Sequence, residues 1–349
     1  MYSIGYISIR IKEKIYFLMT CQNEKQILTF DRIKIKCDHK YLLNTKVRFN
    51  ETYNPRNGNR IGIYYSSKGD TSIPYNLYIA VNYAKQTLTI EFSSKILMDK
   101  YIHLISKITI KECLNNINQL NICSIDVDNI LLNGVITSLD VTKDINLTLN
   151  DDILNALNTQ VNNYRRYKWI HYSKEGITFS KNVKSKDCTE AMIVYDKEKE
   201  ICASHNKDFL SYVSQPQSLV NHFIGKTRFE VTLDTPQKIM SYLNLTDTKV
   251  SSVLNAKVNP ILYQYDKIFS SPKLVSESSK FNNYEDWSMK VLIEAYNGDL
   301  KRLEQEIRDK YPSRSGALKR MKKIEAIYHT MTSASTSENL IETVRNLLL

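Results

Sequence analysis

The chain of 349 residues lacks several features that would assign it to a protein class directly. Its six cysteines form no Cys-x-x-Cys pair and have no histidine partners at zinc-binding spacing, so we expect free thiols in a reducing compartment. No run of about 18 uncharged apolar residues could span a bilayer, and charges interrupt the opening segment where a signal peptide would be apolar. These absences predict a cytoplasmic protein with no membrane partner.

Basic residues are in excess. The chain has 48 Lys and Arg against 37 Asp and Glu, a net charge of +11. Such a balance favours an anionic partner, most commonly nucleic acid, although a basic surface without a partner would also explain it. Residues 1–130 carry 18 basic and 11 acidic residues, whereas the chain from Glu285 onward carries 11 and 10. We therefore expect the DNA-facing charge in the first two thirds of the chain.

The order of periodic segments predicts an α+β fold with a central antiparallel sheet flanked by helices and followed by a C-terminal helical segment. Three regions are expected: a β-rich, DNA-binding region at 1–130, a core at 131–269, and helices at 281–349, with Trp287 in a core. No internal repeat stands out, although two sheet-bearing halves would fit the pattern. The expected elements include strands at 27–36, 60–65, 75–82 and 87–92, helices at 95–105 and 151–164, and a hairpin at 168–181.

Two further strands carry carboxylates on their polar faces. Alternation places Asp140 and Asp144 on one face of the first strand, and Arg228 and Glu230 on one face of the second. A carboxylate in mid-strand suits a half-buried sheet poorly, so two such strands suggest an oxygen-rich site for Mg²⁺ or Mn²⁺. The alternative is that these carboxylates face water on an open sheet, which we favour for Asp144 taken alone.

Tyr195 ends a third strand and is followed by Lys197, which could clamp a phosphate while the phenol attacks it. The chain has 23 tyrosines, so this spacing by itself is a weak signal. The phenol has a pKa near 10 and needs a base to take its proton, and the sequence identifies none.

Taken in order, these segments resemble rolling-circle replication initiators of the filamentous-phage gene II type and the plasmid Rep-trans type. The similarity rests on Leu139-Asp140-x-x-x-Asp144, Val194-Tyr195-Asp196-Lys197 and Arg228-Phe229-Glu230-Val231. It implies a Rep-like nicking fold and an enzyme that nicks and rejoins single-stranded origin DNA, leaving a 5′-phosphotyrosine link and a free 3′-OH. It also implies Tyr195 as nucleophile, Asp140 and Glu230 as metal ligands with Asp144 as a third acid, and Arg228 and Lys197 as phosphate contacts.

Two departures from the family pattern are visible. The six histidines contain no His-hydrophobic-His pair, so the metal site has to be built from carboxylates. Ser138 stands before Leu139, where relatives usually carry arginine, so the site loses one cation there. Two alternatives remain open: a non-catalytic, sequence-specific DNA-binding protein on the same fold, and a conjugative relaxase. A replication initiator would also meet a host helicase and polymerase.

Additional DNA contacts are expected outside the three motifs. Arg165, Arg166 and Lys168 are interleaved with aromatic residues, a pattern that can stack bases and neutralise phosphates. Packing between a helix end and a strand explains that run equally well. Arg56 and Arg60 flank a turn that could touch phosphates, although charged turns are usually only solvated.

Overall fold

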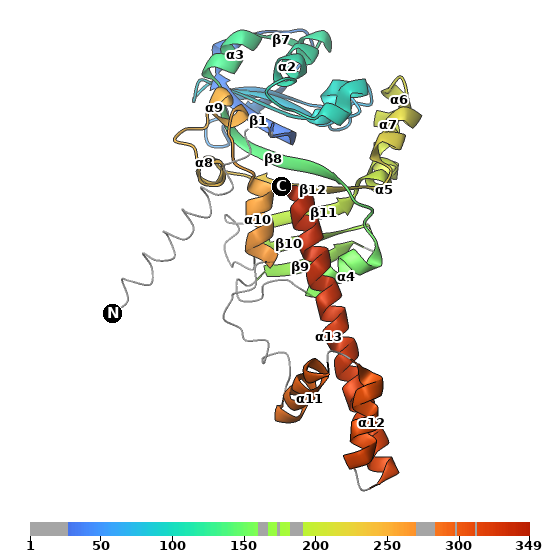
Figure 1. Cartoon of the computed structure of the whole chain (residues 1–349). Coiled ribbons are helices and arrows are strands. Elements are labelled where there is room, and N and C mark those ends of the chain that lie inside the picture. The colour runs from blue at the N-terminus through green and yellow to red at the C-terminus, as the bar shows by residue number, and fades with distance from the viewer. Residues whose placement is uncertain are drawn as a thin grey trace, which may run out of the picture.

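The computed structural model describes residues 27–159, 167–172, 175–181, 191–269, 283–296, 299–310 and 313–349. The chain is an α+β protein with a large antiparallel sheet, helices packed against it and a C-terminal helical segment, as the sequence predicts (Figure 1). Within the described residues, none of the helices is both long enough and apolar enough to cross a membrane.

Ten strands of the described chain form one sheet in the spatial order β3-β4-β5-β6-β1-β8-β12-β11-β10-β9, and every neighbouring pair is antiparallel. Their bounds are β1 (Phe30–Asp38), β3 (Asn50–Tyr53), β4 (Arg60–Ser66), β5 (Leu77–Asn82), β6 (Thr87–Ser93), β8 (Val135–Asn146), β9 (Tyr167–Tyr172), β10 (Gly176–Lys181), β11 (Ala191–Asp196) and β12 (Lys226–Leu233). A separate two-stranded sheet pairs β2 (Leu42–Thr45) with β7 (Cys123–Ile125). The predicted strands and the hairpin at 168–181 are confirmed.

The large sheet consists of two halves with the same topology. In the N-terminal half, β1 is followed by a meander, β3-β4-β5-β6, that starts at the outer edge and ends beside β1. In the C-terminal half, β8 is followed by the meander β9-β10-β11-β12, which ends beside β8 in the same way. The strands β1 and β8 pair at the centre, with Arg32 opposite Asp140. Residues from the regions 1–130 and 131–269 therefore share one sheet.

The register of the pairs makes the two halves comparable residue by residue. Two residues after Arg32, Lys34 lies opposite Glu91, and two residues after Asp140, Thr142 lies opposite Glu230. Glu91 and Glu230 thus occupy equivalent positions in the two halves. By the same reasoning Ala80, opposite Thr89, is the counterpart of Tyr195, which lies opposite Arg228.

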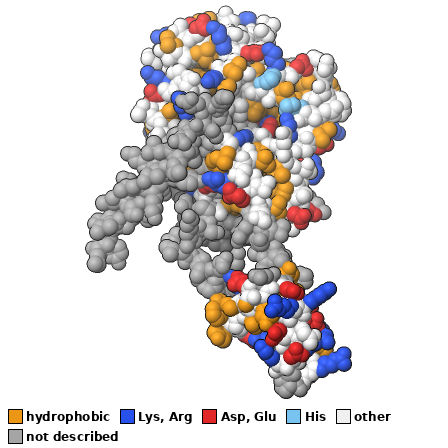
Figure 2. All heavy atoms as spheres, viewed as in Figure 1, with side chains coloured by type: hydrophobic (Ala, Val, Ile, Leu, Met, Phe, Trp, Pro, Cys, Tyr) orange, Lys and Arg blue, Asp and Glu red, His pale blue; other side chains and the backbone are white. Residues whose placement is uncertain are grey.

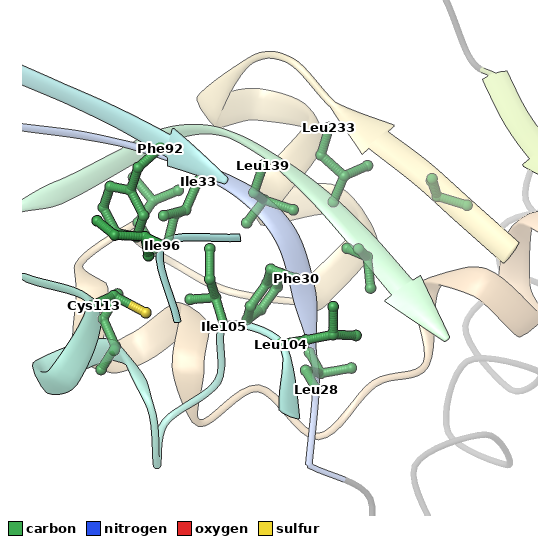
Figure 3. Close-up of a cluster of buried hydrophobic side chains, with 14 of the residues drawn as sticks. Leu28, Phe30, Ile33, Phe92, Ile96, Leu104, Ile105, Cys113, Leu139 and Leu233 are labelled. Carbon is green, nitrogen blue, oxygen red and sulfur yellow. The ribbon is translucent and has the colours of Figure 1, made fainter. Parts of the chain in front are cut away.

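Helices cover the sheet and separate its apolar face from water. On the N-terminal half these are η1 (His39–Tyr41), η2 (Ser94–His103), α2 (Ile110–Gln119) and α3 (Val127–Asn133). On the C-terminal half they are α4 (Asp151–Thr159), α5 (Lys197–Ile201), η4 (Ser204–Asn206), α6 (Lys207–Tyr212), α7 (Pro216–Phe223), α8 (Pro236–Leu243), α9 (Val250–Leu254) and α10 (Pro260–Phe269). Figure 3 shows the core between β1, β6 and β8, where Phe30, Phe92 and Leu139 meet Ile96 and Ile105.

The helix expected over 95–105 is present as a 3₁₀ helix from Ser94 to His103. The segment η2 is a 3₁₀ helix broken at Met98, where φ is 51°, and it ends at Leu104 with φ 54°. These turns let Ile96 and Leu97 enter the apolar core while Tyr101 reaches a polar cluster near the C-terminal half. The helix expected at 151–164 is present from Asp151 to Thr159, and its remaining residues lie outside the described part of the chain.

The C-terminal segment holds a second, smaller core. The helices α11 (Tyr284–Ala295) and α12 (Leu300–Lys310) pack with the first part of α13 (Arg314–Leu348). The last part of α13 returns to the sheet, where the backbone oxygen of Leu348 accepts hydrogen bonds from Lys143 and Asn259 (Figure 1). Acidic and basic side chains mix over the distal helices (Figure 2). The prediction that Trp287 lies in a core is wrong, because it is 41% exposed and packs against Tyr284.

Candidate functional site

The three motif strands lie side by side, in the order β8-β12-β11. Asp144 lies opposite Arg228, and Arg228 lies opposite Tyr195, so one row across the sheet presents all three side chains on the same face. The next strand places Gly176 opposite Tyr195. A Cβ on Gly176 would lie 2.7 Å from the Cβ of Tyr195, so glycine leaves the room that the tyrosine occupies.

Tyr195 donates a hydrogen bond of 2.6 Å from its hydroxyl to Oε1 of Glu230. Burial, followed by the nearby charge of Glu230, raises the pKa of Tyr195 well above its ordinary value. Burial and then the negative charge of Asp31 raise the pKa of Glu230 to about 7. The phenol therefore stays protonated near neutral pH, and Glu230 is a proton acceptor in direct contact with it.

Arg228 is fully buried and links the site to a second carboxylate and a second tyrosine. Its guanidinium forms a two-point ion pair with Asp144, with N–O distances of 2.6 and 2.8 Å. The Nη1 atom also lies 3.3 Å from Oδ1 of Asp31 and 3.1 Å from the hydroxyl of Tyr101. Burial acts to raise the pKa of Asp144, but the charge of Arg228 outweighs it, so this pKa lies below its usual value.

Lys197 is also buried, with 1% of the residue exposed, and it pairs with Glu200 of α5. Its ammonium group lies 5.7 Å from the ring centre of Tyr195, beneath the layer formed by η2, α5 and α7. Burial and the charge of Arg228 lower the pKa of Lys197. We call the cluster of Tyr195, Glu230, Arg228, Asp144, Asp31, Lys197 and Glu200 the tyrosine site.

A cavity adjoins the tyrosine site. It has a volume of about 250 Å³ and is lined by Asp144, His222 and Lys226 among others. Burial, followed by the positive charge of Lys226, lowers the pKa of His222. This cavity reaches the row of Asp144, Arg228 and Tyr195 at its Asp144 end.

The side chain of Asp140 is hydrogen-bonded to a residue outside the tyrosine site. Both of its carboxylate oxygens accept hydrogen bonds from Arg32 of β1, at 2.7 and 3.0 Å. The same guanidinium donates to Ser138 at 3.2 Å and pairs with Glu91 at 2.8 Å. Arg32 thus places a cation from a neighbouring strand beside both Ser138 and Asp140.

The three predicted metal ligands have three different partners: Asp140 pairs with Arg32, Asp144 with Arg228, and Glu230 with Tyr195. Their role in metal binding stays a prediction. Over the described ranges no cluster of three His, Cys, Asp or Glu side chains could hold a metal ion. The negative charge of Asp31 raises the pKa of Glu230, so a cation beside these two carboxylates would relieve their repulsion, and Mg²⁺ commonly uses one or two carboxylates.

The expected DNA contacts outside the motifs are only partly described. Arg165 and Arg166 lie outside the described residues, and Lys168 belongs to β9 at the outer edge of the C-terminal half. Arg56 is exposed in the turn between β3 and β4. Arg60 begins β4, pairs with Glu51 at 3.1 Å and lies 5.5 Å from the ring centre of Tyr83. Within the described residues, the contacts of Arg56 and Arg60 lie outside the tyrosine site: Arg56 donates its backbone N–H to Asn54, and Arg60 contacts Glu51 and Tyr83.

Four residues of this region were missed by reasoning from the sequence: Asp31, Arg32, Tyr101 and Glu200. The first three come from the N-terminal region, and Asp31 is 197 residues away from Arg228 in the chain. The only sequence signal was the adjacent pair of charges at the start of an expected apolar strand. Comparison of the chain with models of protein families gives no match, and a search among curated proteins gives none either.

Proposed function

We propose that the chain is a replication initiator that nicks and rejoins single-stranded DNA, with Tyr195 as its nucleophile. The hydrogen bond between Tyr195 and Glu230 carries this proposal, because it joins a phenol to a base whose pKa is about 7. The adjacent Arg228 and Lys197 supply the positive charge that a phosphodiester needs. Origin DNA, with a host helicase and polymerase, would then be its partners.

In the proposed reaction, the phenol oxygen of Tyr195 attacks phosphorus while its proton passes to Glu230. A bond forms between the tyrosine oxygen and the 5′ phosphate, and the bond from phosphorus to the 3′ oxygen breaks. The 3′ oxygen leaves and takes a proton to become the 3′-OH. Rejoining is the reverse attack by a 3′-OH, so no water or nucleotide is consumed.

Arg228 is held in place by Asp144, which fixes the guanidinium beside the reacting tyrosine. Lys197 is held by Glu200 in a similar way. A Mg²⁺ or Mn²⁺ ion bound by Glu230 and Asp31 would polarise the scissile phosphate as a Lewis acid. The contact between Tyr195 and Glu230 supports Glu230 as the base of the proposed reaction.

The test is formation of a covalent adduct with single-stranded DNA carrying the replication origin, in the presence of Mn²⁺, followed by peptide mapping. Tyr195→Phe should abolish the adduct and cost about 1 kcal/mol of stability, the usual value for one hydroxyl hydrogen bond. The matched control is Tyr101→Phe, which removes a hydroxyl from the same cluster and should leave the adduct in place. An adduct on Tyr101, or no adduct with any single-stranded substrate, would leave a non-catalytic DNA-binding protein as the better explanation.

A further inference from the structure

The polar face of the N-terminal half carries a groove that the tyrosine site does not use. It has a volume of about 340 Å³ and is lined by Lys34, Lys36, Tyr64, Tyr78 and Thr89 among others. These residues come from β1, β4, β5 and β6, and the strand register places them on the face that also presents Tyr195. We call this surface the lysine–tyrosine groove.

The equivalence of the two halves shows what has changed in the groove. The row Asp144, Arg228 and Tyr195 of the C-terminal half corresponds to Lys36, Thr89 and Ala80. The nucleophile position is alanine and the position of an acid is lysine. The N-terminal half therefore keeps the sheet but lacks the reactive side chain, and its charge at this row is positive where the other half has an ion pair.

The groove has the chemistry of a single-stranded nucleic acid site. Lys36 is exposed and makes no ion pair in the part of the chain that the structure describes. Lys34 pairs with Glu91 at 2.8 Å, which fixes its ammonium group at the sheet. The rings of Tyr64 and Tyr78 lie 6.1 Å apart with 30° between their planes. Lysines that neutralise phosphates, beside aromatic rings on which bases stack, are the two components of such sites.

The position of the groove fits a strand that continues to the tyrosine site. Five strand-to-strand steps separate β5, which carries Tyr78, from β11, which carries Tyr195. At about 4.8 Å per step this is roughly 24 Å. That distance corresponds to about seven nucleotides at the ~3.4 Å axial rise of a stacked, helical strand, and to fewer nucleotides of an extended strand.

We propose that the lysine–tyrosine groove binds single-stranded DNA on one side of the cleavage site and holds it across the sheet. This inference rests on the proposed nicking function for its choice of DNA, but binding at the groove does not require cleavage. The affinity of an oligonucleotide that reaches only the tyrosine site should not depend on the groove. One that extends roughly seven or more nucleotides toward the groove should depend on it.

The experiment measures binding of fluorescent oligothymidine by anisotropy, using full-length Tyr195→Phe protein without metal so that no cleavage occurs. Tyr78→Leu removes the ring and should weaken binding of a 20-nucleotide strand about tenfold, while Tyr78→Phe keeps the ring and should bind normally. The matched control is Tyr53→Ala, because Tyr53 is a 52% exposed tyrosine of the same half that does not line the groove. Lys36→Gln removes one positive charge and should reduce the slope of log affinity against log salt by about 0.7. Its control is Lys85→Gln, in the turn before β6, which should change the affinity less than Lys36→Gln does.

Unchanged affinity in Tyr78→Leu, or an equal loss of affinity in Tyr53→Ala, would overturn the proposal that the groove binds single-stranded DNA. Tighter binding of oligouridine than oligothymidine overturns the assignment to DNA. Failure of the nicking function is a separate result: no adduct would form in wild-type protein while Tyr78→Leu still weakened binding. Conversely, Tyr78→Leu could form the adduct with the same dependence on the concentration of a long substrate as wild type. That result would support nicking and would overturn the proposal that the groove binds DNA.

Discussion

Glu230 sets the pH dependence expected at the scale of single residues. An ordinary Glu carboxyl has a pKa near 4.3, whereas burial and Asp31 raise the pKa of Glu230 to about 7 in the folded protein. Between these values the folded state holds a proton that the unfolded chain has released. This group's contribution to stability is therefore fully present below about pH 4 and is lost as pH rises toward 7.

Glu230→Gln should remove that loss. From pH 5 to 7, wild-type protein should lose about 1–3 kcal/mol of stability relative to the variant, measured by urea denaturation at several pH values. The nicking rate of the wild type should rise over the same range, as the base becomes ionised, and this rise should be absent in the variant.

The matched control is Glu91→Gln, at the equivalent position of the other half. Burial acts to raise the pKa of Glu91, but its ion pairs with Lys34 and Arg32 outweigh burial and lower it. Its stabilisation is present above the unfolded pKa and is lost only as pH falls below that value. The difference in stability between Glu91→Gln and wild type should therefore stay constant from pH 5 to 7. If this difference changed with pH as much as the difference between Glu230→Gln and wild type, the role assigned to Asp31 would be contradicted.

At this scale the sequence predicts part of the site. Strand alternation correctly places Asp140 and Asp144 on one face of β8, and Arg228 and Glu230 on one face of β12, because that depends only on local geometry. It cannot reveal that Asp31 lies near Glu230 or that Arg32 occupies both oxygens of Asp140, because these contacts depend on the pairing of β1 with β8. The identity of the base was therefore out of reach of the sequence.

At the scale of elements, the contact between β10 and β11 decides where Tyr195, the proposed nucleophile, lies. Gly176→Ala would place a Cβ 2.7 Å from both the Cβ of Tyr195 and the backbone oxygen of Val194. One of the two strands has to shift, and a displacement of a reacting atom by about 1 Å can cost a hundredfold in rate. We expect a loss of that order in the rate of adduct formation, measured by single-turnover kinetics.

The control is Gly62→Ala in the N-terminal half, where a Cβ would lie 2.3 Å from the backbone oxygen of Val81. The steric conflict is at least as severe, but it lies on strands that do not carry the nucleophile. Gly62→Ala should lower the unfolding temperature and leave the rate per folded molecule within a few-fold of wild type. Equal rate losses in the two variants would show that general instability, and not the position of Tyr195, limits the reaction.

Element boundaries show where local patterns fail. The helix expected at 95–105 is a 3₁₀ helix with a break, because η2 contacts both an apolar core and a polar cluster. Its Ile96 belongs to the apolar core, whereas the hydroxyl of Tyr101 contacts Arg228. Neither requirement is visible from residues within the segment itself.

At the scale of the whole molecule, α13 belongs to two cores. Ile324 lies in the small core formed with α11 and α12, and Leu348 lies in the large core beneath the sheet. Both side chains are 0% exposed. Removing residues 281–349 would therefore strip side chains from the core of the sheet, even though the segment is nearly neutral in charge.

Leu348→Ala should destabilise the sheet-bearing body by about 2–5 kcal/mol, the usual range for such a truncation in a core. Ile324→Ala should destabilise only the distal helices by a similar amount. Hydrogen exchange followed residue by residue would separate the effects, with faster exchange in β8 and β12 for the first variant and in α11 and α12 for the second. The same pattern in both variants would mean that the two cores unfold as one.

The sequence shows no clear internal repeat, although two sheet-bearing halves fit its pattern, and the reason is physical. The two halves share a backbone arrangement but few side chains at equivalent positions: Tyr195 matches Ala80 and Arg228 matches Thr89, while Glu230 matches Glu91. Backbone pairing constrains burial and leaves the polar face free to diverge.

The central pairing of β1 with β8 gives one polypeptide the symmetry that a homodimer has. A homodimer on a palindromic DNA would present the same reactive group to both strands. This chain has Tyr195, the proposed nucleophile, in one half and Ala80 at the equivalent position of the other, so under the proposed function only one strand can be cut. The polarity of any synthesis from the freed end would then be determined by the way the protein sits on the DNA, without help from a second subunit.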